Sequence, residues 1–343
     1  MTNSSKLTCL LFNDLYPWER SALDPLIQRL EKDLQLETVM VTESERRYFK
    51  KERQGNFWVV ARNWFDALAF LSGARYQHGK IFLSVFQESS EKRPLHSLIL
   101  NFLKPALPNH CHLLVHSPLD YRFYAEIEGF KKGERVTMVP LTLPDLKEIP
   151  SVKSVNESLT IGTYGDFTSE NNINYLLGVA HYITQVNSKI QFRVLGRGPL
   201  YTHYLKMIQD MGLSGRVSVA ETVDPKDIAL LDVLLYLPFK NHHFIPVLLA
   251  ASQRIAVLSV EVLGIEQYLQ DGHSGFVVPL NEIKPMGELV LRLSQDPHIR
   301  LEMGKKLLDQ LKTRFDLESV IPSYVSLFLG TQSDPAVGLE SAA

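Results

Sequence analysis

The sequence predicts an α/β protein built from repeated strand–helix units that form doubly wound parallel sheets. Between residues 159 and 280, short apolar runs each end in a turn and are followed by a helical pattern. Most of these runs are continuous rather than alternating, which is typical of parallel strands covered on both faces. Asn172–Val186 and Leu200–Met211 are long enough to be crossover helices between them. Sheets of this kind bind ligands near the carboxyl ends of their strands.

The same rhythm occurs in both halves of the chain. The strands expected in the second half are Leu159–Gly165, Ile190–Gly196, Arg216–Glu221, Asp232–Pro238, Arg254–Val260 and Ser274–Leu280. Those expected in the first half are Leu7–Phe12, Leu36–Thr42, Phe57–Ala61, Lys80–Phe86, Cys111–His116 and Arg135–Val139. The strand–helix alternation in the first half therefore predicts a second Rossmann-like domain.

Helical patterns fill the remaining segments. They cover Trp18–Asp33, Trp64–Tyr76, Leu95–Leu103 and Leu119–Phe130, and later Glu282–Leu293, Ile299–Arg314 and Glu318–Leu329. Asp24-Pro25 is expected to break or restart the first of these helices, and Pro297 separates two of the later ones. We expect domains at 1–145 and 159–314, a linker at 146–158, a C-terminal crossover helix at 315–330 and a fraying tail at 331–343.

Composition sets limits on function. The chain has 343 residues, a formal charge of −2 and 45% apolar residues, which suits two packed domains. Neither half is basic enough to favour nucleic acid as a partner. Cys9 and Cys111 each lie in an apolar run that predicts a strand, so we expect both to be buried thiols of a protein in a reducing compartment. No apolar run reaches the ~18 residues of a membrane span, and the polar start is not a signal peptide, so we expect a cytoplasmic protein.

Four motifs occur in order in the second half, namely Gly196-Arg197-Gly198-Pro199, Asp232–Pro238, Ile245–Ala250 and Asp271–Pro279. Together they resemble the donor domain of a family 4 (group 1) glycosyltransferase of the GT-B fold. The resemblance implies two Rossmann-like domains facing each other across a cleft. It also implies glycosyl transfer from a nucleotide-diphosphate sugar without an obligatory metal.

The resemblance places two phosphate-binding cations after the first donor-domain strand, in a Gly-Arg-x-x-x-x-Lys-Gly run. Aligned on Gly165, this chain has Asp166 in place of the Arg and Asn171 in place of the Lys. Like-charge contact with a diphosphate costs on the order of a kcal/mol or more near a surface. A plain turn capped by Thr168 or Ser169 also accounts for these residues.

The family's Glu-x7-Glu motif is altered as well. Aligned on Pro246, its first Glu falls on Asn241 and its second on Leu249. Asn241 could still hydrogen-bond a sugar hydroxyl, but Leu249 cannot hold a ribose diol. His242 and Phe244 replace glycines and add bulk where donor and backbone approach closely, and His243 adjoins them.

Other donor elements are better kept. The turn Gly196-Arg197-Gly198 precedes a Pro suited to a helix start, and Arg197 could supply one phosphate contact, although a solvated Arg is the default. Gly264 keeps one glycine of a later turn. A dinucleotide-binding dehydrogenase is excluded because Tyr201 stands where the third glycine of that motif belongs.

The acceptor side offers four candidates by resemblance. Tyr16 and Trp18 could form a stacking surface for a sugar, or could pack the entry of the first helix. Gln87 stands where relatives have a His, and His116 matches the end of the family's first domain. A metal site at His110, His112 and His116 is not expected, because no cluster of cysteines or carboxylates joins them.

Two functions remain. The favoured one is a GT-B protein whose transferase activity is lost or strongly altered, acting as a binding or partner protein beside an active glycosyltransferase in glycan or surface-polysaccharide assembly. The alternative is an active enzyme with a rebuilt donor site that uses a UDP-, GDP- or ADP-sugar as substrate and no cofactor. A purely packing role for the old site stays open. Tyr48 and Phe49 in the charged run Glu43–Arg53 suggest weak peripheral contact with the inner face of a membrane, or a solvated loop.

Overall fold

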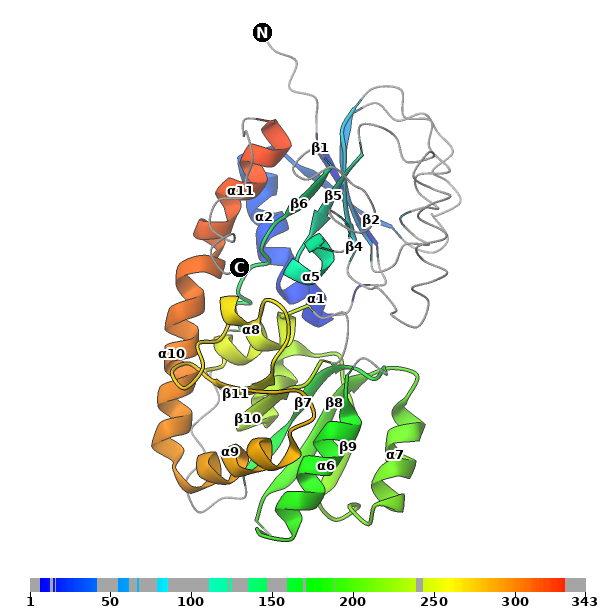
Figure 1. The fold of residues 1–343 in the computed structure, drawn as a ribbon. Coiled ribbons are helices and arrows are strands. Elements are labelled where there is room, and N and C mark those ends of the chain that lie inside the picture. The colour runs from blue at the N-terminus through cyan, green and yellow to red at the C-terminus, as the bar shows by residue number, and fades with distance from the viewer. Residues whose placement is uncertain are drawn as a thin grey trace. The chain divides into compact units, whose positions relative to one another are not determined.

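The computed structural model divides the chain into two compact units (Figure 1). The first unit comprises residues 1–142 and 317–343, and the second comprises residues 143–316. The structure describes residues 7–12, 15, 17–41, 55–61, 67, 79–85, 111–122, 124, 135–146, 159–168, 171–187, 189–238 and 243–330.

The first unit contains a six-stranded parallel sheet in the order β2-β1-β3-β4-β5-β6. Its strands are β1 (Leu7–Phe12), β2 (Glu37–Val41), β3 (Asn56–Ala61), β4 (Ile81–Val85), β5 (Cys111–Val115) and β6 (Val136–Met138). All six strands predicted from the apolar runs are confirmed, with ends that differ by one residue or so. Cys9 and Cys111 are buried free thiols on β1 and β5, and burial raises the pKa of both.

The first predicted helix is indeed two helices. α1 (Pro17–Ser21) ends where the Ser21 hydroxyl donates to the carbonyl of Trp18, and α2 (Asp24–Asp33) restarts with Pro25 in its first turn. α5 (Pro118–Arg122) covers the start of the predicted Leu119–Phe130 helix. The helices predicted at Trp64–Tyr76 and Leu95–Leu103 lie outside the described residues, apart from Ala67.

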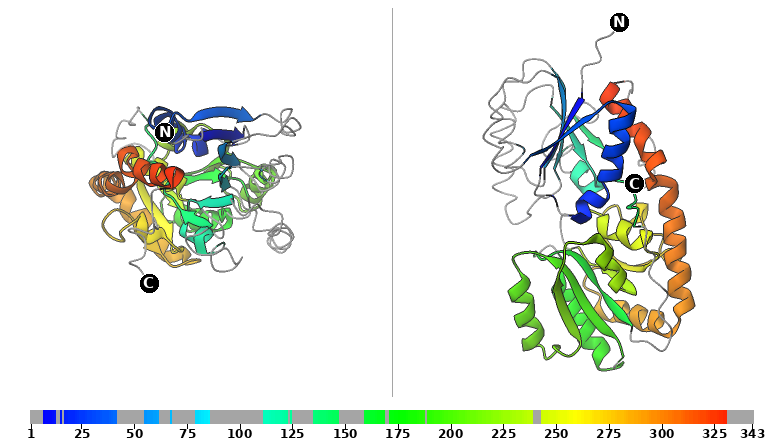
Figure 2. Two further views of the ribbon diagram at one scale, coloured as in Figure 1. Left: turned by 90° about the horizontal axis from the view of Figure 1, so that it is seen from above. Right: turned by 180° about the vertical axis from the view of Figure 1, so that it is seen from behind.

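α11 (Leu317–Leu329) packs on the first unit's sheet and lies beside α2 (Figures 1 and 2). Tyr324 is fully buried, its ring lies 5.6 Å from that of Trp58, and its hydroxyl donates to the carbonyl of Pro140 at 3.1 Å. Phe328 packs edge-on against Phe82 at 4.8 Å. These apolar contacts attach the helix, because burial of large aromatic side chains dominates such interfaces.

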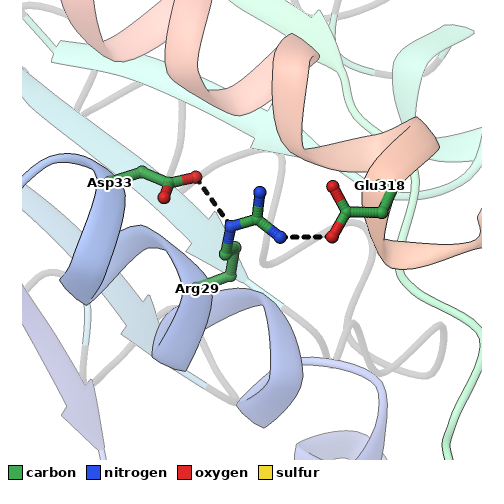
Figure 3. A network of polar contacts seen from close by, with 3 residues as sticks. All are labelled: Arg29, Asp33 and Glu318. Atoms are coloured by element: carbon green, nitrogen blue, oxygen red, sulfur yellow. Dashed lines mark hydrogen bonds and ion pairs between the residues drawn. The ribbon is translucent and has the colours of Figure 1, made fainter.

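A surface ion-pair network also joins α2 to α11. The Arg29 guanidinium donates to Asp33, one turn along its own helix, and to Glu318 on α11 (Figure 3). Hydrogen bonds and charges from these carboxylates raise the pKa of Arg29. The three side chains are solvent-accessible, so the network adds orientation rather than much stability.

The second unit contains a six-stranded parallel sheet in the order β12-β11-β10-β7-β8-β9. Its strands are β7 (Thr160–Asp166), β8 (Gln191–Arg197), β9 (Val217–Glu221), β10 (Val233–Tyr236), β11 (Ala256–Val260) and β12 (Phe276–Val278). All six predicted strands are confirmed here too. The central strands β10 and β11 are buried at every residue, as continuous apolar runs require.

Helices wind around this sheet. They are α6 (Ile173–Thr184), α7 (Tyr201–Asp210), α8 (Ile245–Ser252), α9 (Ile283–Gln295) and α10 (Pro297–Phe315), with short 3₁₀ turns η4 (Pro225–Leu230) and η5 (Ile265–Gln267). α6 packs against α9, α8 packs against α10, and α7 contacts the edge strand β9 (Figure 2). The break predicted at Pro297 is confirmed, since Asp296 caps α10 by accepting from the amides of His298 and Ile299.

α8 is the helix that periodicity did not identify. Its sequence Ile245-Pro246-Val247-Leu248-Leu249-Ala250-Ala251 has no polar face, and all seven side chains are buried. A helix enclosed on all sides carries no amphipathic signal. Among the described residues, no helix combines the length and the hydropathy that a bilayer crossing would need.

Candidate functional site

The carboxyl edge of the second sheet brings together the first set of donor-cleft candidates. β7 and β8 run parallel in a register that aligns Gly165 with Gly196 and Asp166 with Arg197. Gly196 has φ of 152°, and a Cβ there would lie 1.7 Å from the carbonyl oxygen of Gly165. Only glycine allows the two strand ends to approach this closely.

Phe167 fills the space beneath this turn. Its side chain is 1% exposed, and its ring stacks on that of Tyr201 at 6.2 Å and packs edge-on against Tyr204 at 5.6 Å. The amide of Phe167 donates to the carbonyl of Arg197, and its carbonyl accepts from the amide of Leu200, the cap of α7. The apolar ring of Phe167 therefore packs at the start of α7, the end of a helix that favours an anion, and the amide of Leu200 already has a backbone partner.

Asn171 and Asn172, just before α6, bond nearby backbone groups. The Asn171 amide donates to the carbonyl of Asp166 at 2.6 Å, and Asn172 caps α6 by accepting from the amide of Tyr175. Asn171 also forms a bridge to Pro238, after β10. The residue aligned with the family's Lys thus bonds the backbone at the end of β7, and its side chain carries no charge.

The second set of donor-cleft candidates lies just before α8 and within it. Leu249 is 0% exposed and sits in the interior of the unit. Phe244 occupies the position just before α8 and is 2% exposed, while the carbonyl of His243 accepts from the hydroxyl of Tyr236 at 3.1 Å. Asn241 and His242 lie outside the described residues.

Phe244 belongs to a column of buried aromatic rings, defined by Tyr236, Phe244, Tyr268 and Phe315. Successive ring centroids lie 5.7, 4.1 and 4.8 Å apart, and the last two pairs are stacked. Burial raises the pKa of both tyrosines, which therefore remain neutral at physiological pH. The column makes the region around the α8 start part of the core. Sequence reasoning missed it because Tyr268 and Phe315 lie far from Phe244 along the chain.

The charge at this edge is mainly negative. Among the described residues, charged side chains that end β7, β8 and β9 are Asp166, Arg197 and Glu221, and Asp224, Lys226 and Asp227 follow β9. The pKa of Tyr164 is raised mainly by burial, and also by the charges of Asp227 and Asp224. Arg197 is exposed. A diphosphate approaching this edge would meet more carboxylates than cations.

Gly264, the donor-cleft candidate after β11, lies in a tight turn. It has φ of 88° and caps η5 after β11. Its left-handed conformation is one that glycine adopts without strain. The residue is therefore required by the backbone of the turn, whichever ligand the edge binds.

The described acceptor-side candidates lie in the first unit. Trp18 is 1% exposed, so its ring packs the entry of the first helix and presents no stacking face to solvent. His116 is buried, its Nδ1 donates to the carbonyl of Val139 at 3.1 Å, and burial lowers its pKa to about 4. Tyr16 and Gln87 lie outside the described residues. Within the described ranges, no group of three or more His, Cys, Asp or Glu side chains is arranged to hold a metal.

Two α/β units, each with a six-stranded parallel sheet, define the GT-B class of glycosyltransferase folds, and comparison with solved structures agrees. The Anabaena protein HepE, solved in complex with UDP and glucose, superposes with a TM-score of 0.72 over 96% of this chain and 100% of its own, at 11% identity. Sucrose-phosphate synthase from Thermosynechococcus elongatus gives 0.70 over 95% and 99%, at 14% identity. Such identities establish the fold alone.

Residues 146–308 match the family described as glycosyl transferases group 1. The chain therefore has the GT-B fold, and this segment of it is similar to the group 1 glycosyltransferases. It is 26% identical over 160 residues to alpha-D-kanosaminyltransferase of Streptomyces kanamyceticus, covering 45% of this chain and 41% of that enzyme. It is 20% identical over 161 residues to N-acetyl-alpha-D-glucosaminyl L-malate synthase of Bacillus anthracis, covering 46% and 42%. The chain thus spans about two fifths of the length of these curated relatives.

Proposed function

We propose that this protein is a group 1 glycosyltransferase homologue whose transferase activity is lost or strongly altered, and that it serves as a binding or partner protein in glycan assembly. The observation that carries the proposal is the packing at the start of α8. Leu249 is fully buried, and Phe244 stacks on Tyr268 with ring centroids 4.1 Å apart. By the resemblance, these are positions where an active enzyme holds the ribose and admits the sugar.

The packing is energetically costly to undo. A buried aromatic pair contributes about 0.5–1.5 kcal/mol beyond its buried area. Exposing a buried leucine forfeits a further ~1.5–3 kcal/mol. A donor that needed this space would have to offset both terms, and Leu249 would offer its ribose no hydrogen bond in return.

The phosphate side supports the same proposal independently. Asp166 and Asn171 stand where two cations are implied, and Asn171 is engaged with the carbonyl of Asp166. Phe167 lies across the start of α7. Removing two cations and adding one carboxylate weakens diphosphate binding through loss of charge-assisted hydrogen bonds, each worth about 1.5–3 kcal/mol.

The alternative is an active transferase with a rebuilt donor site. In its favour, Arg197 is exposed beside the glycine turn at the ends of β7 and β8. The curated relatives named above are themselves sugar-transferring or sugar-joining enzymes by name. In this alternative a UDP-, GDP- or ADP-sugar would be the substrate, bound by Arg197 and by polar groups other than the two altered positions.

The partner of the favoured function would be an active glycosyltransferase or another glycan-assembly protein. The same proposal places the protein in the cytoplasm, in peripheral contact with the inner face of the membrane. The protein would need no cofactor for this role.

A turnover assay separates the two functions. Wild-type protein and Arg197→Ala are incubated with UDP-, GDP- and ADP-sugars, with and without a mixture of glycan acceptors, and release of nucleoside diphosphate is measured. The proposal predicts release at the no-protein background for both proteins. Turnover by wild type that is lost in Arg197→Ala would establish the rebuilt donor site instead.

A further inference from the structure

β9 is an edge strand of the second sheet. It stands last in the order of that sheet, and among the described residues its strand partner is β8. The carbonyl of Arg216 and the amide of Thr222 both bond β8, the latter through the carbonyl of Gly196. Parallel strands bond a neighbour through alternate residues, so Val219 and Glu221 direct their amides and carbonyls away from β8. Within the described part of the chain, no backbone group from another segment meets them.

The opposite edge of the same sheet is protected. β12 has three residues, and the amide of Val277, in its middle, donates to the carboxylate of Asp271 at 2.9 Å. Natural sheets protect their edges with short strands, lysines, prolines or bulges, because an open edge pairs with other chains. β9 has five residues without Lys or Pro, and its pairing with β8 is continuous. The contrast between the two edges indicates that β9 is used for pairing.

The side chains of β9 suit a second copy of the same strand. Ser218 and Ala220 are exposed on one face, while Val219 lies on the other face, half-buried against the core. A two-fold axis through Val219, perpendicular to the sheet, makes two β9 strands antiparallel. It sets Val219 opposite Val219 of the second copy, and Ser218 opposite Ala220. Small residues then meet on the exposed face and β-branched residues meet on the core face, as stable cross-strand pairs require.

The charges at the ends of β9 favour the same arrangement. Arg216 precedes the strand, whereas Glu221 ends it and Asp224 follows it. Asp224 is itself extended, with φ of −77° and ψ of 119°. Antiparallel pairing about Val219 brings Arg216 of each copy diagonally opposite Asp224 of the other, a separation that a long side chain spans. Two-fold symmetry makes this contact between opposite charges occur twice.

We propose that the edge of β9 binds the same edge of a second copy of this chain, so that their two six-stranded sheets become continuous. α7 contacts β9, so the α7 helices of both copies flank the new strand pair. The assembly closes at two copies, because an isologous contact uses the β9 edge of each. A contact built around one strand pair lies at the low end of interface sizes, and we expect a dissociation constant of about 1–100 µM. This inference goes beyond the proposed function and stands whether or not a nucleotide sugar binds.

The test is sedimentation velocity of the full chain across that range of concentration. Ser218→Lys with Ala220→Lys sets lysine opposite lysine at two places in the strand pair. Ser218→Lys with Ala220→Glu sets lysine opposite glutamate at the same two places. Both positions are exposed, so neither double variant disturbs the core. The control is Gln295→Lys with His298→Lys, which adds two lysines at exposed positions on α9 and α10.

The proposal predicts that wild type and the control pass from monomer to dimer as concentration rises, and that the lysine–lysine variant stays monomeric. The lysine–glutamate variant should dimerise at a concentration about threefold or more below that of wild type. A wild type that remains monomeric throughout would overturn the proposal and leave the edge to a segment of another protein. A dimer that survives in the lysine–lysine variant would place the contact on another surface. A lysine–glutamate variant that stays monomeric would refute the antiparallel register.

Discussion

The ring of Phe244 lies on the ring of Tyr268, with centroids 4.1 Å apart and planes inclined by 18°. This contact converts the entrance of α8 from an open turn into part of a packed core. The resemblance implies glycine at position 244, and glycine has no side chain to make such a contact. A single residue thus both closes a space and links it to Tyr268, further along the chain.

Position 249 tests whether α8 is part of the core. We expect Leu249→Glu to lower the free energy of unfolding by several kcal/mol at pH 7, because it buries an unpaired carboxylate. Burial raises the pKa of that carboxyl, so its destabilising effect relative to wild type grows as pH rises from about 4 to 7. Urea denaturation at both pH values measures this.

The matched control is Leu205→Glu. Leu205 is 42% exposed on α7. Surface substitutions usually change stability by less than about 0.5 kcal/mol. If Leu249→Glu is as mild as the control, position 249 is open to solvent and the packing argument fails.

The glycine contact between β7 and β8 predicts a second asymmetry. Gly196→Ala should destabilise the second unit by about 3 kcal/mol or more, since its Cβ would overlap the carbonyl of Gly165 at 1.7 Å in a left-handed backbone. Gly215→Ala, in a turn with open space around it, should be near neutral. Thermal unfolding of the two variants compares them directly, and similar melting temperatures would refute the close approach.

α11 should be held by its apolar face rather than by its ion pair. Tyr324→Ala is expected to cost about 3–5 kcal/mol, because it removes a fully buried ring packed on Trp58. Glu318→Gln should cause a far smaller loss that fades as salt concentration rises. Unfolding followed at low and at high salt separates the two, and a salt-sensitive collapse in Glu318→Gln would reverse the assignment.

Buried His116 predicts acid sensitivity of the first unit. Its pKa in the folded protein is about 4, against 6.5 ordinarily. Between these values the unfolded chain binds a proton that the folded chain does not, so stability falls as pH drops from 6.5 to 4. The loss from this group approaches about 3 kcal/mol at the lower limit.

His116→Gln keeps a donor for the carbonyl of Val139 and removes the titration. We expect its free energy of unfolding to depend less on pH across this window than that of wild type. His181→Gln, on an exposed face of α6, controls for loss of an imidazole. An unchanged pH slope in His116→Gln would show that other groups cause the acid loss.

The sequence predicted the strands well because buried parallel strands leave an unmistakable apolar run, as in Val233–Tyr236. It did not predict α8 as a helix, because Ile245–Ser252 has no polar face to set a period. It identified Leu249 and Asp166 as departures from the resembled family, since those are local facts of residue type. It could not show that Leu249 is enclosed on every side.

The aromatic contacts could not be predicted from the sequence for a different reason. Phe167, Tyr201 and Tyr204 meet because two strand ends are brought together, and Phe244 meets Tyr268 across two separate turns. No spacing within one segment encodes such pairs. Trp18 illustrates the same limit. From sequence alone, a tryptophan that stacks on a sugar cannot be distinguished from one that packs a helix, and only its burial decides between the two.

Calorimetric titration of the purified protein with UDP, GDP, ADP and their sugars tests the central claim most directly. With Leu249 buried, Phe244 stacked on Tyr268 and the phosphate cations absent, we predict heats no larger than dilution across the panel. Saturable binding at micromolar concentration, corresponding to about −8 kcal/mol, would contradict the account and identify the donor at once.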